Sequence, residues 1–393
     1  MTPLEDIKVI DFTHAFAGPL CTQVLAAMGA DVVKIEPPNG EEGRTFLKGT
    51  GFASFNMGKK SIGVDLKTSQ GKGVIHNLVK DADVVVENFR PGKASDLDID
   101  FETLSDLNET IVYCSISGFG QEGPYSSYPA FDPMIQAMSG IMDATGYPDR
   151  PPVRIGTSAI DCGTGMTAAC SIIAAILSRE RTGEGEYIDV SLYDVGISWM
   201  ANWISYYSDQ GETPKRSGTT MYGSSPNGLF QVGEGDEYVY VAAHFQPQFE
   251  KLCEAIDRED LIEDDRFSTG EVRWDNREKL QEELEQSFEK YSTRQLVYEL
   301  AENGVPAGPV QDVAEIIEED PQVESRNMLT DTYNPFSEST VKTSSLPFRT
   351  KGGLVELSNP PEFGEHVRPI LVEHGFSDDE IDELLNEEIL HKE

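Results

Sequence analysis

The first half of this 393-residue chain alternates between strand-like and helix-like segments, and this alternation constrains the fold more than any other feature. Short apolar runs predict six strands, at residues 8–12, 31–36, 61–66, 83–88, 111–116 and 187–192. Helical patterns lie between them, including 19–28, which begins with proline and is followed by Gly29, and 69–80, which follows a Thr68 cap. A repeated strand–helix–strand order predicts an α/β fold with a doubly wound, parallel, Rossmann-like sheet and right-handed crossovers. We therefore expect a ligand at the carboxyl ends of the strands.

The alternation ends near Tyr206, where a loop-like run rich in glycine, serine and proline begins. A strand pair at 229–232 and 237–242 follows, and then charge-rich helical sequence to about residue 319. This change predicts three parts: residues 1–205 as the N-terminal part of a large domain, 221–327 as a smaller α+β domain, and 328–393 as a C-terminal part that returns to the large domain. The last part includes a predicted helix at 378–385.

The formal net charge of −38 at pH 7 limits the partners of the protein. Such a negative field repels nucleic acids and anionic membrane surfaces, so we expect neither as a partner. Charge of this size suits molar salt, where screening acts within about 3 Å, and favours a halophilic source such as a halophilic archaeon. The N-terminus lacks a signal peptide pattern, and no apolar run approaches the ~20 residues of a membrane span. We therefore predict a cytoplasmic protein.

Metal and redox chemistry find no support in the residue spacing. The five cysteines are scattered without a C-x-x-C pair, which fits reduced intracellular thiols. The six histidines show no ligand spacing, so no metal site is expected. Neither G-x-G-x-x-G nor a P-loop motif occurs, which disfavours a dinucleotide cofactor and a P-loop phosphate site.

The segment 156–194 is the strongest candidate for a reactive site. Its Asp161 precedes Gly163 and Gly165, which we expect to form a turn that lets the backbone approach a ligand. A long apolar helix follows, which we expect to end just before Gly183, and then a strand. Helix N–H groups near this carboxylate would stabilise its ionised, nucleophilic form. From the residues alone, Asp161 as a simple helix N-cap stays open. Cys162 is an alternative nucleophile, although neither a basic neighbour nor a nearby histidine favours its thiolate.

This segment resembles the signature of the class III CoA transferases, the formyl-CoA transferase and CaiB–BaiF group. The closing part of the signature, R-T-G-x-G-x-x-x-D-V-S-L-x-D, is present from Arg181 to Asp194. Other family-like segments occur in family order over nearly the whole chain, among them V-I-D-F-T-H-A-F-A-G-P, G-A-D-V-V-K-I-E-P-P, V-E-N-F-R-P-G, S-I-S-G-F-G-Q-E-G-P, F-D-P-M-I-Q-A-M-S-G and G-V-P-A-G-P-V. The resemblance implies a homodimer of two ring-like subunits that are interlocked.

The resemblance also implies that Asp161 is the catalytic nucleophile and that CoA lies along the carboxyl edge of the large domain's sheet. Residues at family positions that line the CoA and substrate site are His14, Ala15, Phe16, Lys67, Asn88, Phe89, Arg90, Asp132, Gly223, Ser224 and Ser225. Lys67 can supply positive charge near the CoA phosphates, and Asn88 and Phe89 can contact the adenine or pantetheine portion.

The implied reaction passes through covalent intermediates on Asp161. The carboxylate attacks a donor thioester, and the released CoA thiolate then attacks the aspartyl carbonyl to give an enzyme–CoA thioester. Backbone N–H groups near Gly163 or in the 223–228 loop can hold the oxyanions. No cofactor beyond CoA, as substrate and product, is implied. The first expectation for the acids is a C4–C5 dicarboxylate pair such as succinate and mesaconate.

Three departures from the family pattern bear on specificity. Phe16 replaces a glutamine of the formyl-CoA enzyme, and Pro37 and Asp96 replace basic residues. An acyl-CoA racemase on the same fold is one alternative; it uses the histidine of a G-H-D motif, where this chain has Phe131, which cannot transfer a proton. A non-catalytic CoA-binding protein is the other alternative.

Overall fold

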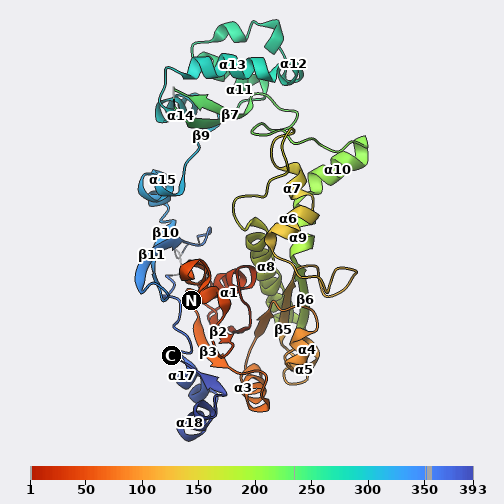
Figure 1. Cartoon of the computed structure of the whole chain (residues 1–393), viewed down its shortest axis with the longest axis vertical. Helices are drawn as coiled ribbons and strands as arrows, with labels where there is room; N and C mark the ends of the chain where they lie inside the picture. Colours follow the sequence, from red (N-terminus) through yellow and green to blue (C-terminus); the bar gives the residue numbers. More distant parts are fainter. Residues whose placement is uncertain (1, 234, 350, 352–355, 393) are drawn as a thin grey trace. The chain divides into compact units, whose positions relative to one another are not determined.

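The computed structural model describes residues 2–233, 235–349, 351 and 356–392. The chain divides into two compact units (Figure 1). The first unit comprises Met1–Ser139, Gly156–Met200 and Pro321–Glu393, and the second comprises Gly140–Ile155 and Ala201–Asp320. The predicted domain boundaries at 205, 221 and 327 stay a prediction. The predicted C-terminal part includes residues 350, 352–355 and 393, which lie outside the described residues.

A seven-stranded sheet forms the centre of the first unit, with the order β12-β3-β2-β1-β4-β5-β6. Six of its strands are parallel, and β12 pairs antiparallel with β3. The strands are β1 Lys8–Asp11, β2 Asp31–Glu36, β3 Lys60–Val64, β4 Val84–Glu87, β5 Val112–Ser117, β6 Glu186–Ser191 and β12 Leu390–His391. The six predicted strands and their parallel arrangement are confirmed, with bounds that differ by at most two residues. The edge strand β12 was not predicted.

The strand order places β1 and β4 side by side, although two strands separate them in the sequence. The connections that leave the carboxyl ends of β1 and β4 therefore run in opposite directions. Such a reversal opens a crevice at the carboxyl edge of an α/β sheet, where ligands bind. The loops after β1 and β4 contain His14, Ala15, Phe16, Asn88, Phe89 and Arg90, which the resemblance assigns to the CoA and substrate site.

Helices cover both faces of this sheet, because successive strand residues point to opposite sides. Tyr113 of β5 lies in the core cluster formed with α3 Ser69–Val79, α17 Val367–Glu373 and α18 Asp378–Asn386. The next residue, Cys114, lies close to Cys21 of α1 Ala17–Ala27, on the other face. The predicted Thr68 cap is confirmed, because its side chain accepts a hydrogen bond from Gly71 N at the start of α3.

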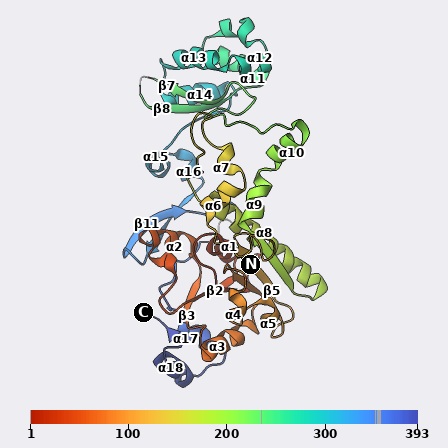
Figure 2. The same cartoon turned by 45° about the vertical axis from the view of Figure 1, so that its right-hand side comes forward.

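The longest helix, α8 Ala159–Thr182, packs against α1, β5 and β6, and it lies beside α1 in both views (Figures 1 and 2). Its predicted end at Gly183 is confirmed, with a φ of 76°. By length and composition alone α8 could cross a membrane, so the expectation that no apolar run approaches that length is wrong. Because 44% of its apolar window is buried inside the protein, we interpret α8 as a core helix.

Other elements complete the first unit. They are α2 Thr50–Phe55, α4 Lys93–Asp96, α5 Phe101–Ser105, α6 Asp132–Met138, α9 Leu192–Trp199, α16 Pro321–Ser325, the antiparallel pair β10 Leu329–Asn334 and β11 Ser339–Ser344, and the short 3-10 turns Glu42–Arg44 and Phe46–Gly49.

The second unit is a small α+β structure around an antiparallel sheet of β7 Asn227–Val232, β8 Glu237–Ala242 and β9 Ala307–Pro309. The predicted strand pair corresponds to β7 and β8. Its core joins these strands to α11 Gln246–Ala255, α13 Arg277–Phe288 and α14 Thr293–Glu302. The remaining elements are α7 Ile141–Ala144, α10 Ala201–Gln210, α12 Gly270–Asp275, α15 Val313–Glu318 and the 3-10 turns Glu259–Leu261 and Asp265–Phe267.

Candidate active site

The side chain of Asn88 joins the loops that follow β1 and β4. Its Nδ2 donates to His14 O at 2.8 Å, and its Oδ1 accepts from His14 N at 2.9 Å. The rings of His14 and Phe89 lie 5.7 Å apart. The structure thus brings four predicted site residues, His14, Ala15, Asn88 and Phe89, to the point where the strand order reverses.

The loop after β1 carries backbone strain. Ala15 has a φ of 66°, a left-handed conformation that costs a non-glycine residue roughly 1–2 kcal/mol. Strain of this kind persists only where surrounding contacts hold it, and it concentrates at functional sites. The next residue, Phe16, places its ring 5.2 Å from that of Phe55 and 6.1 Å from that of Phe46. Phe46 was not predicted, and no pattern in the sequence indicates that residues 16 and 46 meet.

Two predicted cationic residues lie in loops at the same edge of the sheet. Lys67 follows β3 and Arg90 follows β4, and both are exposed. Neither the ammonium of Lys67 nor the guanidinium of Arg90 forms a hydrogen bond or an ion pair with any described residue. They are therefore available to an anionic group such as a phosphate.

The predicted residues Gly223, Ser224 and Ser225 belong to the second unit. Ser224 Oγ accepts a hydrogen bond from Asn227 Nδ2 at 3.2 Å. Ser225 is buried, and its carbonyl accepts from Nε of the fully buried Arg273 at 3.1 Å. This loop is therefore tied to the core of its own unit.

Asp161 lies inside the first turn of α8, which begins two residues earlier at Ala159. Gly163 and Gly165 are helical, so the predicted turn is wrong. A Cβ on Gly163 would lie 2.2 Å from the Trp199 ring, and one on Gly165 would lie 2.6 Å from Ala17 O. These glycines therefore permit close packing of helices rather than the approach of a ligand. The Gly163 N–H lies beyond the first turn, where helix N–H groups bond within the helix, so it is not a free oxyanion donor.

The carboxylate that caps α8 belongs to Asp132, the first residue of α6. Its Oδ2 accepts from Ile160 N at 2.8 Å and from Asp161 N at 3.2 Å, and its Oδ1 accepts from Gln136 Nε2 at 2.5 Å. The side chain of Asp161 forms no hydrogen bond or ion pair with any described residue. The N-cap interpretation of Asp161 is therefore wrong, and Asp132 occupies the helix donors that we expected to stabilise it.

Burial and the negative charge of Asp132 raise the pKa of Asp161 to about 7. The expectation that helix N–H groups favour its ionised form is thus reversed, because those groups already bind Asp132. An unpartnered carboxylate in this environment keeps its lone pairs free for attack on a carbonyl. Burial, with the charges of Asp161 and Asp132, also raises the pKa of the Cys162 thiol, so this cysteine stays protonated at neutral pH.

Helix packing links the helix that carries Asp161 to the strained loop of the first unit. Gly165, about one turn after Asp161, contacts the carbonyl of Ala17, and Ala17 begins α1 directly after that loop. The candidate nucleophile and the candidate CoA loop are therefore joined by the packing of α8 on α1.

Phe131 is the N-cap residue of α6, and its ring is exposed.

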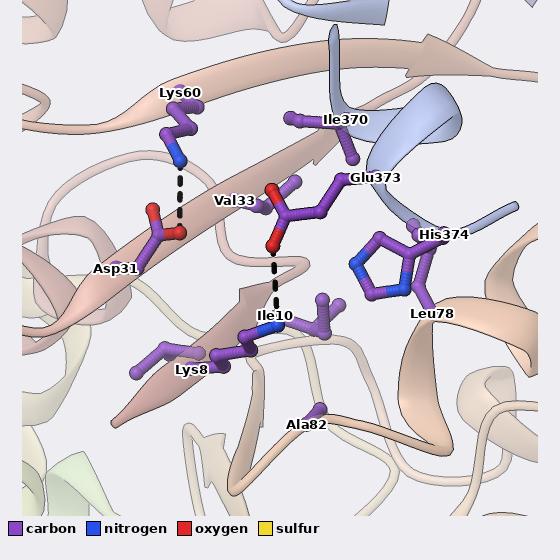
Figure 3. Close-up of a pocket in the computed structure, with 11 residues that line it drawn as sticks. Lys8, Ile10, Asp31, Val33, Lys60, Leu78, Ala82, Ile370, Glu373 and His374 are labelled. Carbon is purple, nitrogen blue, oxygen red and sulfur yellow. Dashed lines mark hydrogen bonds and ion pairs between the residues drawn. The ribbon is translucent and has the colours of Figure 1, made fainter. Parts of the chain in front are cut away.

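A small cavity lies at the opposite, amino edge of the sheet (Figure 3). Its volume of about 20 Å³ suits a single water molecule and not an acyl-CoA. Lys8 pairs with Glu373 at 3.2 Å, and Lys60 pairs with Asp31 at 2.8 Å (Figure 3). Among the described residues, no group of three or more His, Cys, Asp or Glu side chains could hold a metal ion.

Comparison with known proteins identifies the family. The model of CoA-transferase family III matches residues 4–367. The succinyl-CoA:mesaconate CoA-transferase of Haloarcula hispanica is 36% identical over 95% of this chain and 97% of its own. The acetyl-CoA:oxalate CoA-transferase of Acetobacter aceti is 38% identical over 83% of this chain and 85% of its own. The crystal structure of a CAIB/BAIF family protein from Brucella suis has a TM-score of 0.85 and 37% identity, covering 95% of this chain and 99% of that one. The chain is therefore a member of CoA-transferase family III, and it is a CoA transferase.

Proposed function

We propose that this enzyme moves CoA between dicarboxylic acids through covalent intermediates on Asp161, with succinyl-CoA as donor and mesaconate as acceptor as the first choice. The observation that carries the proposal is the Asp161 carboxylate itself. It is held in the first turn of α8 with no partner among the described residues, about one turn from the contact with α1. Asp132 fixes the main chain of that turn.

In the proposed reaction, Asp161 attacks the thioester carbonyl of the donor. The C–S bond breaks, leaving a mixed anhydride and a CoA thiolate. The thiolate then attacks the aspartyl carbonyl and expels the donor acid, which leaves an aspartyl–CoA thioester. The acceptor carboxylate attacks this thioester, and the thiolate released again attacks the acceptor's acyl carbon and frees Asp161. Each step exchanges one carboxylate for one thiolate, so no net proton or electron is needed.

Residues at the carboxyl edge of the sheet suit the binding of CoA. The cations of Lys67 and Arg90, which pair with no residue in the described part of the chain, match its phosphates. The loops joined by Asn88 offer the ring of Phe89 and main-chain groups. On the resemblance alone, Gly223, Ser224 and Ser225 of the second unit stay predicted substrate-binding residues.

The choice of a C4–C5 acid rests on two supports. The Haloarcula relative bears the name of a succinyl-CoA and mesaconate enzyme. The aromatic group of Phe16, Phe46 and Phe55 forms an apolar wall, which favours an acid with carbons to bury. Oxalate, the acid in the name of the Acetobacter relative, has no such carbons.

We also propose the interlocked homodimer. Helix α10 buries none of its residues within the chain, and its Ile204 and Tyr207 are exposed. Helix α15 also buries none, and its Val313 and Ile316 are exposed. A second subunit threaded through the first would cover such surfaces. Light scattering on dilution should find a dimer and no folded monomer at nanomolar concentration, because interlocked chains separate only on unfolding.

The decisive experiment incubates the enzyme with succinyl-CoA and mesaconate in molar KCl. We expect mesaconyl-CoA and free succinate in equal amounts. With donor alone, borohydride or hydroxylamine should modify Asp161, as identified by peptide mass. Label found on Cys162 would contradict the assignment of Asp161 as the nucleophile. Deuterium entering the α-position of a 2-methylacyl-CoA would favour the racemase, and CoA binding without exchange of labelled acid would favour a binding protein.

A further inference from the structure

We infer that Lys34 is a positioning residue for acyl-CoA, whose buried ammonium fixes the loop after β1 by holding the carbonyl of Thr13. The inference rests on the proposed function, in which this loop contacts CoA. Lys34 lies on β2, outside the predicted set of site residues, and its side chain is fully buried.

Side chains hold the main-chain N–H and C=O groups of both Thr13 and His14 in this loop. Thr13 N donates to Asp11 Oδ1 at 2.8 Å, and Thr13 O accepts from Lys34 Nζ at 2.6 Å. His14 N and His14 O are both bound by Asn88. Three side chains, from β1, β2 and the loop after β4, thus replace the main-chain pairing that a strand or helix would supply. They hold the backbone directly before the left-handed Ala15.

Lys34 belongs to a largely buried group of three cationic and three carboxylic side chains. The cations are Lys34, Lys59 and Arg44, and the anions are Asp11, Glu36 and Glu41. Burial alone would lower the pKa of Lys34, but the carboxylates of Glu41, Asp11 and Glu36 raise it above its ordinary value. The Lys34 ammonium therefore stays charged at neutral pH.

The distances from Lys34 Nζ to its neighbours show which group the ammonium binds most closely. Lys59 Nζ lies 3.0 Å from Asp11 Oδ2, and Arg44 Nε lies 2.6 Å from Glu36 Oε2, so both cations bind carboxylates directly. Lys34 Nζ lies 3.5 Å from Glu41 Oε2 and only 2.6 Å from Thr13 O. Among the described residues, neither oxygen of Glu41 has a hydrogen-bond partner. The ammonium is thus directed to the loop carbonyl at the expense of its ion pair.

Replacement of Lys34 by methionine keeps much of the side-chain length and removes the ammonium. In Lys34→Met we expect a rise of at least about 10-fold in the KM for acyl-CoA and in the Kd for free CoA, equivalent to one lost charge-assisted hydrogen bond. We expect kcat to change less than about 3-fold and the KM for the acceptor acid to stay unchanged, because α8 and Asp161 are not touched. Amide hydrogen exchange in the 12–20 peptide of the ligand-free protein should become faster.

The matched control is Lys60→Met, which also removes a paired lysine from a strand of the same sheet, at the amino edge. It should leave both the KM and the exchange of the 12–20 peptide unchanged. Since Lys34→Met leaves Glu41 buried and uncompensated, the double variant Lys34→Met/Glu41→Gln removes both charges and should fold. It should show the same rise in KM.

If the wild type transfers CoA, a folded Lys34 variant with wild-type KM and Kd would overturn this inference and leave the proposed function standing. A fall confined to kcat would also overturn it, because Lys34 would then act on the chemistry. Failure of the double variant to fold would assign Lys34 to the stability of the fold instead. A wild type that neither binds nor transfers CoA would overturn the proposed function together with the inference.

Discussion

The carboxyl edge of the seven-stranded sheet, where its parallel strands end, and the amino edge, where they begin, use charged side chains in opposite ways. At the carboxyl edge, the Lys59–Asp11 pair has both side chains 0% exposed. At the amino edge, the Lys8–Glu373 pair has side chains that are 40% and 54% exposed. Exposed pairs contribute about 0–1 kcal/mol to stability, whereas burial of charges has a desolvation cost that pairing only partly offsets. Of these two pairs, the one at the carboxyl edge therefore carries the higher desolvation cost.

The costly edge is also the edge with the candidate active site. There the backbone of Ala15 is strained, and the carboxylate of Asp161 is half-buried without a partner among the described residues. The amino edge combines exposed ion pairs with a cavity that suits one water molecule. The contrast indicates that stability is given up where loops and a nucleophile must be held in place, and not elsewhere in the sheet.

The largest expected effect tests whether the unpartnered carboxylate performs the chemistry. Asp161→Asn keeps the shape but cannot form the anhydride, so kcat should fall by more than about 10³-fold. The fold should stay intact, because the Asp161 side chain holds no described residue. Isotope exchange between acid and acyl-CoA measures the activity, and circular dichroism checks the fold. Substantial residual CoA transfer in this variant would show that Asp161 is not the nucleophile.

A second prediction concerns pH. Only ionised Asp161 can attack, so kcat/KM should rise about 10-fold per pH unit below a midpoint near 7 and level off above it. The folded pKa lies above the unfolded value of 3.8, so ionisation of Asp161 makes the fold less stable as pH rises from about 4 to about 7. Asp161→Asn should lose that part of the pH dependence of Tm.

The neighbouring charge provides the control for this pH dependence. Asp132→Asn removes the neighbouring negative charge that helps to raise the pKa of Asp161 and keeps an oxygen to cap α8, so the midpoint of kcat/KM should move below 7. A flat profile between pH 5 and pH 8 in the wild type would contradict the environment assigned to Asp161.

The third prediction compares two asparagines, one at each edge. Asn88 binds both main-chain groups of His14, and Asn108, just before β5, donates to Val79 O and Ala82 O. Asn88→Ala should lose about 1–2 kcal/mol of unfolding free energy for its two hydrogen bonds. Asn108→Ala should lose more, because Asn108 Oδ1 also accepts from Thr110 N and Thr110 Oγ1. Only Asn88→Ala should raise the KM for acyl-CoA, by about 10-fold. Urea unfolding and steady-state kinetics measure the two effects, and equal KM values would show that the edges do not differ in function.

The smallest expected effect lies at the amino edge. Lys8→Met removes the ion pair with Glu373, and because both groups are partly exposed the loss in stability should be less than ~0.5 kcal/mol. Kinetic constants should match those of the wild type. A change in KM here would mean that the cavity region is coupled to the site at the other edge.

Local patterns were sufficient to predict much of the fold. Short apolar runs predicted the six parallel strands, Thr68 marked the start of α3, and Gly183 marked the end of α8. These features depend on neighbours within a few residues, so the sequence expresses them directly. The edge strand β12 was missed because it has only two residues. Its pairing depends on β3, which lies far away in the chain.

The amino-acid sequence by itself determined the family, the strand–helix order and the identity of Asp161 as the candidate nucleophile. Only the tertiary structure decided the environment of that carboxylate. Asp132 lies 29 residues before Asp161, yet it takes the helix N–H groups and its charge raises the pKa. Lys34 and Thr13 also lie 21 residues apart, and only the folded chain brings the Lys34 ammonium to the Thr13 carbonyl. Burial and charge act through space, so residues distant in the chain set the chemistry of a site that a local motif can only locate.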